Sequence, residues 1–209
     1  MRNKDEEFVN AWTHLVSCFA CVFAVLYVMT SPQISAFNKV GFLPMGLTTI
    51  WTFFSSYRYH ICNDPKQKER DRSVDRTAIF LMILGCGLSA SLTCMSKVFS
   101  MTMCVLLCLV AGIATVIYNS SKTFSDWVYV TTYVTIGWFA TIPSLGIFDD
   151  SLYAQTGVIP YILASGALYC TGIIFYTKDS KKWNHTIWHL FVMAGACAHI
   201  TAHIYSISR

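Results

Sequence analysis

The sequence predicts an all-α, polytopic membrane protein with seven transmembrane helices, and two observations carry this prediction. Of its 209 residues, 55% are hydrophobic and only 12% are charged, whereas about a quarter of the residues in an ordinary soluble domain are charged. A soluble core of this size could not bury so many apolar side chains without leaving large patches exposed. The chain also contains seven apolar runs of about 20 residues, the length that a helix needs to cross a bilayer core.

The runs are expected to be helices rather than barrel strands, because each is continuous and lacks the alternation of a transmembrane strand. The expected spans are residues 11–30, 40–62, 76–96, 98–118, 126–147, 157–177 and 186–207. They occupy most of the chain, so we expect one seven-helix domain over residues 1–209. The connections are short, and the one expected linker is the charged segment 63–74.

Composition also narrows the class of protein. It excludes a disordered chain and a soluble basic nucleic-acid binder, since 55% of the residues are hydrophobic and the net charge is only +4. It also excludes a secreted disulfide scaffold, because eight of the nine cysteines lie within expected spans and the ninth, Cys62, is the last residue of one; inside a span, cysteine acts as a small hydrophobe. The expected partners are membrane lipids, one of them a candidate substrate, with no nucleic acid. The expected location is the plasma membrane or an endomembrane. A cleaved signal peptide is disfavoured because Asp5, Glu6 and Glu7 precede the first span.

The distribution of Lys and Arg predicts the orientation, because these residues gather on the cytoplasmic side of membrane proteins. With seven spans, twelve of them share the side of the N-terminus and three lie opposite. The twelve are Arg2, Lys4, Arg58, Lys66, Lys68, Arg70, Arg72, Arg76, Lys122, Lys178, Lys181 and Lys182; the three are Lys39, Lys97 and Arg209. The N-terminus is therefore expected in the cytoplasm and the C-terminus outside.

Two histidines at the start of the last span form the first candidate site. His185 and His189 are spaced i, i+4, so their rings lie one turn apart on one helical face and can reach one metal ion. A zincin protease would need a glutamate directly after the first histidine, and Thr186 occupies that position. The sequence therefore does not predict a soluble metalloprotease.

The orientation places further ionisable residues in the same leaflet. His60 ends the second span, Asp75 precedes the third and His14 begins the first, all on the predicted cytoplasmic side. Ionisable residues inside a span are costly and indicate function by default. Polar residues also recur along one face of two spans, which predicts that these faces point into the bundle. The two polar faces consist of Glu7, Asn10, His14 and Ser17, and of Thr49, Thr52, Ser56 and His60.

Three histidines with a nearby carboxylate have the composition of a catalytic zinc site. We expect His60, His185 and His189 to bind Zn²⁺. A water at the open position of zinc has a lowered pKa and can act as a nucleophile. Asp75 would take the proton of this water or orient the water, and Ser56 would support the site. The alternative is a buried polar network without metal, and Cys62 is a further candidate ligand.

A second pair, His199 and His203, lies on the same helix. It starts 14 residues after His185, about 21 Å further along a helix, and therefore belongs to the outer leaflet. The only acidic residues expected near this pair are Asp149 and Asp150, in a loop on the outer side. We expect interhelical hydrogen bonds rather than a second metal site here.

Four segments, in order along the chain, resemble the motifs of the hemolysin III / progestin and adipoQ receptor (PAQR) family, seven-span membrane proteins related to the alkaline ceramidases. The segments are Glu6-Glu7-x-x-Asn10-x-x-Thr13-His14, Ser55-Ser56-Tyr57-Arg58-Tyr59-His60, Asp75-Arg76-Thr77-Ala78-Ile79-Phe80 and His185-Thr186-Ile187-Trp188-His189-Leu190-Phe191-Val192 with His199. The expected spans four to six carry no motif, and the stretch after the start of the third span departs from the family pattern.

The resemblance implies a seven-helix fold with a cytoplasmic N-terminus. It also implies zinc bound by His60, His185 and His189, with Asp75 on the water, and a His199 that is not a ligand. Three functions remain open: a zinc-dependent hydrolase acting on a lipid amide or ester, a receptor or lipid sensor with structural zinc, and a cytolytic, pore-forming or membrane-homeostasis protein. The first is the expectation, because zinc with an open position beside a carboxylate suits attack on an acyl carbon.

Overall fold

The computed structural model describes residues 3–120, 125–146, 151–178 and 180–209. These residues form α-helices and one short 3-10 helix, and none of them lies in a strand. The elements are α1 (Lys4–Thr30), α2 (Ala36–Ile61), α3 (Pro65–Cys94), α4 (Lys97–Ser120), α5 (Asp126–Thr141), η1 (Ile142–Leu145), α6 (Leu152–Gln155), α7 (Ile159–Tyr176) and α8 (Asn184–Ile207). The all-α prediction is confirmed for this part of the chain.

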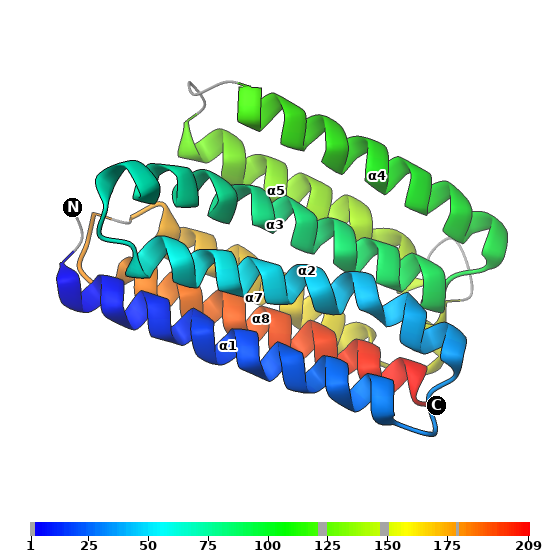
Figure 1. Cartoon of the computed structure of the whole chain (residues 1–209). Coiled ribbons are helices and arrows are strands. Elements are labelled where there is room, and N and C mark those ends of the chain that lie inside the picture. Colours follow the sequence, from blue (N-terminus) through cyan, green and yellow to red (C-terminus); the bar gives the residue numbers. More distant parts are fainter. Residues whose placement is uncertain (1–2, 121–124, 147–150, 179) are drawn as a thin grey trace.

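The long helices lie side by side along a common direction, with α4 at the outer edge of the bundle (Figure 1). The first turn of α1 and the last turn of α8 lie at opposite ends of the bundle. Within the described residues, four helices (α1, α3, α7 and α8) are long and apolar enough to cross a membrane. Crossing by all seven long helices, and the orientation across the bilayer, stay predictions; Arg2 and Lys122 of the charge count lie outside the described residues.

Helix α1 shows why the fold belongs in a membrane. Its capping box, in which Asn3 and Glu6 satisfy each other's backbone groups, starts the helix. Its buried face carries Asn10, His14 and Ser17, while large apolar side chains on the other face are exposed. These exposed residues include Phe8, Trp12, Val16, Phe19 and Phe23. A water-soluble helix has the opposite arrangement, so the outer face of α1 contacts lipid.

The predicted polar face of the second span is confirmed as well. Thr49, Thr52, Ser56 and His60 of α2 are all buried. This face packs against α1 on one side and α3 on the other. Both polar faces therefore point into the bundle, where helices satisfy one another's polar groups.

Helices α2 and α3 approach closely at Gly85. A methyl group at this position would lie 2.4 Å from the Pro44 carbonyl oxygen and 2.0 Å from Oγ1 of Thr48, closer than any stable contact. One turn further on, the backbone N–H of Met45 donates to Oγ of Ser89 at 2.9 Å. The glycine and the serine together hold the two helices at a distance that a larger residue would forbid.

The expected linker over residues 63–74 is wrong, because α3 already begins at Pro65. Asp64 caps the helix by accepting the N–H of Gln67 at 2.7 Å, and a proline suits the first helical position. Asp71 then accepts from Arg58 at 3.2 Å and from Gln67 at 2.9 Å. These contacts stabilise two charged helical turns that apolar periodicity could not reveal.

The fifth expected span, 126–147, also differs from the structure. Helix α5 ends at Thr141 and continues as η1, after which Gly146 has a φ of 79°. This left-handed conformation suits glycine, which lacks a Cβ, and it ends the helical run. Asp149 and Asp150 lie outside the described residues.

Candidate metal centre

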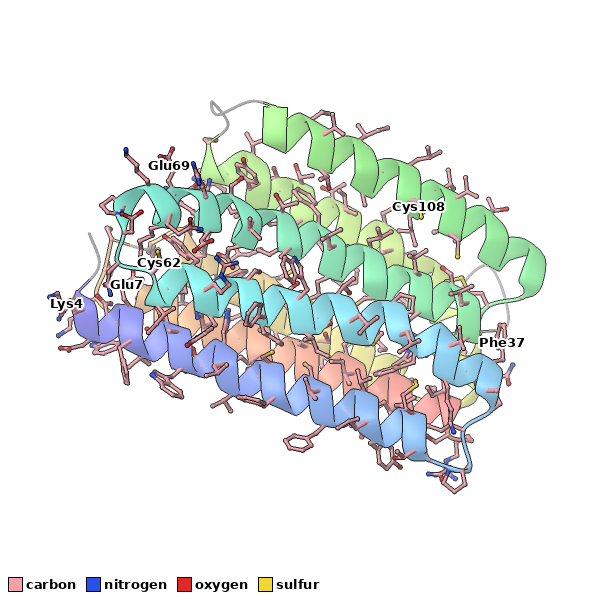
Figure 2. All side chains as sticks on the ribbon, in the orientation of Figure 1. Lys4, Glu7, Phe37, Cys62, Glu69 and Cys108 are labelled. Atoms are coloured by element: carbon pink, nitrogen blue, oxygen red, sulfur yellow. The ribbon has the colours of Figure 1, made fainter. Side chains whose placement is uncertain are left out.

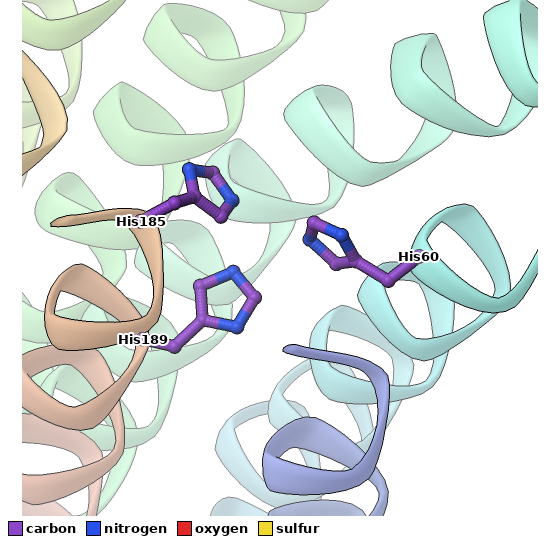
Figure 3. Close-up of side chains that lie close together, drawn as sticks. All are labelled: His60, His185 and His189. Atoms are coloured by element: carbon purple, nitrogen blue, oxygen red, sulfur yellow. The ribbon is translucent and has the colours of Figure 1, made fainter. Parts of the chain in front are cut away.

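Three buried histidines from two helices come together at one end of the bundle. His60 lies in the last turn of α2, and His185 and His189 lie in the first turns of α8. Each offers one ring nitrogen, and these atoms all lie within 4.8 Å of one another. Figure 3 shows the three rings turned toward a common point between the two helices. The ring centroids are 4.6 to 5.2 Å apart.

A carboxylate orients His60. Oε2 of Glu7, on α1, lies 3.0 Å from Nδ1 of His60 and also accepts from the ammonium group of Lys68 at 2.9 Å. A carboxylate on one ring nitrogen favours the tautomer that carries its proton there, which leaves the other nitrogen as a metal ligand. Glu7 lies at the same end of the bundle as Cys62, where α2 ends (Figure 2). The donor set and this carboxylate fit a zinc ion.

The start of α8 is fixed by α1. Trp183, the residue before α8, has a φ of 68°, an uncommon conformation for a residue other than glycine. Its backbone N–H donates to the carboxylate of Glu6. Oγ1 of Thr186 donates to Oδ1 of Asn10 at 2.6 Å. Through these two contacts α1 sets the position of the first turn of α8, which carries His185.

His14 forms one wall of the centre. Its ring stacks on that of His189, with centroids 3.8 Å apart and an interplanar angle of 12°. Both of its ring nitrogens are buried and have no hydrogen-bond partner among the described residues. His14 is not part of the three-histidine group, so its contact with the centre is through its ring face.

A cavity of about 200 Å³ opens beside the histidines and extends between α3, α5, α7 and α8. His185 and His189 line it, as do the predicted residues Ser56 and Asp75. Ser56 lies on α2 one turn before His60, and Asp75 lies on α3 and is partly buried. The structure therefore brings Asp75 and Ser56 to the same cavity as the histidines.

Part of this arrangement was predictable from the sequence. The sequence pattern placed Glu7 near the histidines without a partner, and Lys68 fell in the expected linker. Glu6 and Trp183 received no role. Cys62, the further candidate ligand, donates instead to the carbonyl oxygen of Asp64 at 3.6 Å. The acidic pair at the start of an otherwise apolar helix was the signal available for Glu6 and Glu7.

His203 of the second pair is buried among hydrogen bonds, as expected. Its Nδ1 lies 2.5 Å from the hydroxyl of Tyr153, and its Nε2 lies 3.4 Å from Oγ1 of Thr93. His199 differs, because its buried Nε2 has no hydrogen-bond partner among the described residues. The expectation of interhelical hydrogen bonds is thus confirmed for His203 and is not met at Nε2 of His199.

A helical bundle with apolar outer faces, polar inner faces and a buried histidine cluster defines an integral, multi-pass membrane protein. A model of the family described as "Haemolysin-III related" matches residues 2–200, so the chain belongs to this family. The resemblance to the hemolysin III / PAQR family is thereby confirmed.

Similar proteins come from bacteria and from an animal. The "Hemolysin-3 homolog" of Bacillus subtilis (strain 168) is 28% identical over 92% of this chain and 90% of its own length. The "Hemolysin-3" of Bacillus cereus is 26% identical over 91% of this chain and 87% of its own length. The "Adiponectin receptor protein" of Drosophila melanogaster is 23% identical over 91% of this chain but only 48% of its own length.

Proposed function

We propose that this protein is a zinc-dependent hydrolase that acts on a lipid amide or ester near the cytoplasmic face of a seven-span bundle. The observation behind this proposal is the cluster of His60, His185 and His189, of which His185 and His189 line a largely apolar cavity. These three side chains would hold the ion. Zinc bound there would supply a Lewis acid and a water of lowered pKa.

The residues around the cluster have separate roles in this proposal. Asp75 accepts a proton from the attacking water and returns it to the leaving group, because it is the carboxylate of α3 that lines the same cavity. Ser56 donates a hydrogen bond to the reacting carbonyl group or to a ligand side chain. Glu7 holds His60 in the tautomer that a metal needs. Glu7 is thus a positioning residue, since it acts through His60.

The apolar part of the cavity supports a lipid as the substrate. Met82, Ile83 and Trp138 are among its lining residues. An acyl chain could lie along this surface while its polar end reaches the histidines, and the surrounding bilayer supplies such molecules at high concentration. The proposal therefore needs no soluble substrate to enter the bundle.

A turnover assay tests the proposal. Purified, zinc-loaded protein in lipid nanodiscs is incubated with a panel of ceramides, acyl amides and acyl esters, and fatty-acid release is measured. We expect release that stops when a chelator removes zinc and resumes when zinc is restored. Binding of these lipids without any turnover in the zinc-loaded protein would contradict the hydrolase.

A receptor or lipid sensor with structural zinc is the second candidate. It is favoured by the three-histidine cluster itself, which joins α2 to α8, and by the name of the Drosophila relative. It predicts that zinc removal lowers the thermal stability of the protein, while Asp75→Ala spares any signalling response. The hydrolase predicts instead that Asp75→Ala abolishes turnover.

A cytolytic or pore-forming activity is the third candidate, favoured by the names of the two Bacillus relatives. It predicts release of a trapped dye from liposomes that contain the protein. That release would depend on Glu7, which contacts His60, and on Asp75, which lines the cavity. Dye retention by liposomes with the correctly folded protein would remove this candidate.

A further inference from the structure

The cavity beside the histidine cluster has a second polar group at its far end. His189 and His199 both line it. They are ten residues apart on α8, which corresponds to about 15 Å along a helix. Val192 lies between them on α8, and the lining residues from neighbouring helices include the apolar Ile83 and Trp138. The cavity therefore has two histidine-bearing regions separated by an apolar stretch.

His199 has unused hydrogen-bonding capacity. Its Nε2 is buried and has no hydrogen-bond partner among the described residues. Such atoms are rare in native proteins, because an unmade buried hydrogen bond costs free energy. Neighbouring polar groups are satisfied: Oγ of Ser165 donates to the Gly195 carbonyl oxygen at 2.8 Å, and both ring nitrogens of His203 have partners.

The charge distribution identifies the kind of group that His199 would bind. The charged residues among those that line the cavity are Arg72, Asp75, Arg76 and Asp126. Arg72, Asp75 and Arg76 lie in the first half of α3, and Asp126 is the first residue of α5. An ion pair between Arg76 and Asp126 joins these two helices. Among the described lining residues, none is charged at the His199 end of the cavity, and a buried ion without a partner is costly. A neutral imidazole can instead exchange a hydrogen bond with a hydroxyl or a carbonyl group.

We propose that His199 binds a second, neutral polar group of the lipid, such as a hydroxyl, about 15 Å from the group that reaches the histidine cluster. The preferred ligand is then an amphiphile with a polar group at each end of an apolar segment. This inference rests on the proposed function for the identity of the reacting end. His199 is a specificity-determining residue in this account and takes no part in the chemistry.

Binding of a matched pair of ligands tests the proposal without requiring turnover. The pair is a long-chain methyl ketone, which cannot be hydrolysed, and its derivative with a hydroxyl at the far end, both long enough to span the cavity. Dissociation constants are measured on zinc-loaded protein in nanodiscs. We expect the hydroxylated ketone to bind about tenfold more tightly, the effect of one hydrogen bond to a buried partner.

Three variants show whether His199 is responsible. His199→Phe keeps an aromatic ring and removes both nitrogens, so the tenfold preference should vanish. His199→Asn keeps a polar group and should retain part of the preference. Val192→Ala changes the cavity wall away from His199 and should weaken both ligands alike. Without ligand, His199→Phe should be at least as thermally stable as the parent protein, because Nε2 makes no hydrogen bond that the substitution could remove.

Equal affinities for the two ketones in the parent protein would overturn the proposal, as would an unchanged preference in a folded His199→Phe variant. Failure of both ketones to bind would overturn it too, since the cavity would not be the lipid site. The hydrolase is judged separately by fatty-acid release. If the protein prefers the hydroxylated ketone but never releases fatty acid, the role of His199 stands and the proposed hydrolase activity is contradicted.

Discussion

The carboxylate of Glu7 lies 3.0 Å from Nδ1 of His60, although the two residues are 53 positions apart in the sequence. The same carboxylate oxygen contacts Lys68, so it connects the first turns of α1 with the end of α2 and the start of α3. A metal site that depends on the tautomer of His60 therefore depends on α1, which contributes no member of the three-histidine cluster.

Replacing Glu7 should weaken zinc binding without removing a ligand. We expect Glu7→Gln to lower zinc affinity by about 10- to 100-fold, because removing a carboxylate that is hydrogen-bonded to a metal-binding histidine typically has an effect of this size. Competition with a chromophoric chelator measures the affinity. Asp5→Asn is the matched control, since Asp5 is an exposed acid in the same first turn. Equal affinities for Glu7→Gln and the parent protein would show that this carboxylate does not support the site.

Replacing Asp75 should separate chemistry from metal binding. We expect Asp75→Asn to lower kcat for lipid hydrolysis by about 100-fold, as loss of a general base does, with zinc content unchanged. Glu69→Gln, on an exposed position of the same helix, should keep full activity. Unchanged turnover in the Asp75 variant would remove Asp75 from the reaction.

Ser56 should have a smaller effect than Asp75. We expect Ser56→Ala to reduce turnover by about tenfold, the effect of one hydrogen bond lost at the reacting group, while zinc is retained. Ser55→Ala is the control, because Ser55 is equally buried but donates to the Thr52 carbonyl oxygen. A larger loss in the Ser55 variant than in the Ser56 variant would contradict the role assigned to Ser56.

The close approach of α2 and α3 should make Gly85 sensitive to the smallest substitution. We expect Gly85→Ala to lower the free energy of unfolding by about 1–3 kcal/mol, since the added methyl group meets the Pro44 backbone and the helices must separate. A thermal unfolding assay in detergent measures the change. Gly137→Ala has open space at its Cβ and should cause little loss; an equal loss in both variants would indicate that helix spacing is not the cause.

Much of the fold followed from the sequence because lipid allows few alternatives. A spanning segment must satisfy its own backbone hydrogen bonds, so long apolar runs predicted helices, and polar stripes predicted their inner faces. The start of α3 was missed because Asp64, Pro65 and Asp71 stabilise it by capping and side-chain pairing. None of these three residues contributes to a periodic pattern of apolar side chains.

The candidate site was predictable to the extent that it depends on positions along single helices. The spacing of His185 and His189 follows from one helix, and topology placed His60 at the same end. The contact of Glu7 with His60 depends on how α1 and α2 are rotated about their axes, which the sequence pattern leaves open. The unbonded Nε2 of His199 depends on which groups of α3, α5 and α7 face it, and this information appears only when the helices pack.

Metal content is the decisive measurement for the three-histidine site. Zinc is measured by mass spectrometry in the purified parent protein and in a variant in which His60, His185 and His189 are all replaced by alanine, with His199→Ala as a histidine control. We predict about one zinc ion per chain in the parent protein and in the control, as a single three-histidine site implies, and none in the triple variant. Equal metal content in the parent protein and the triple variant would contradict the metal centre, and with it the proposed hydrolase.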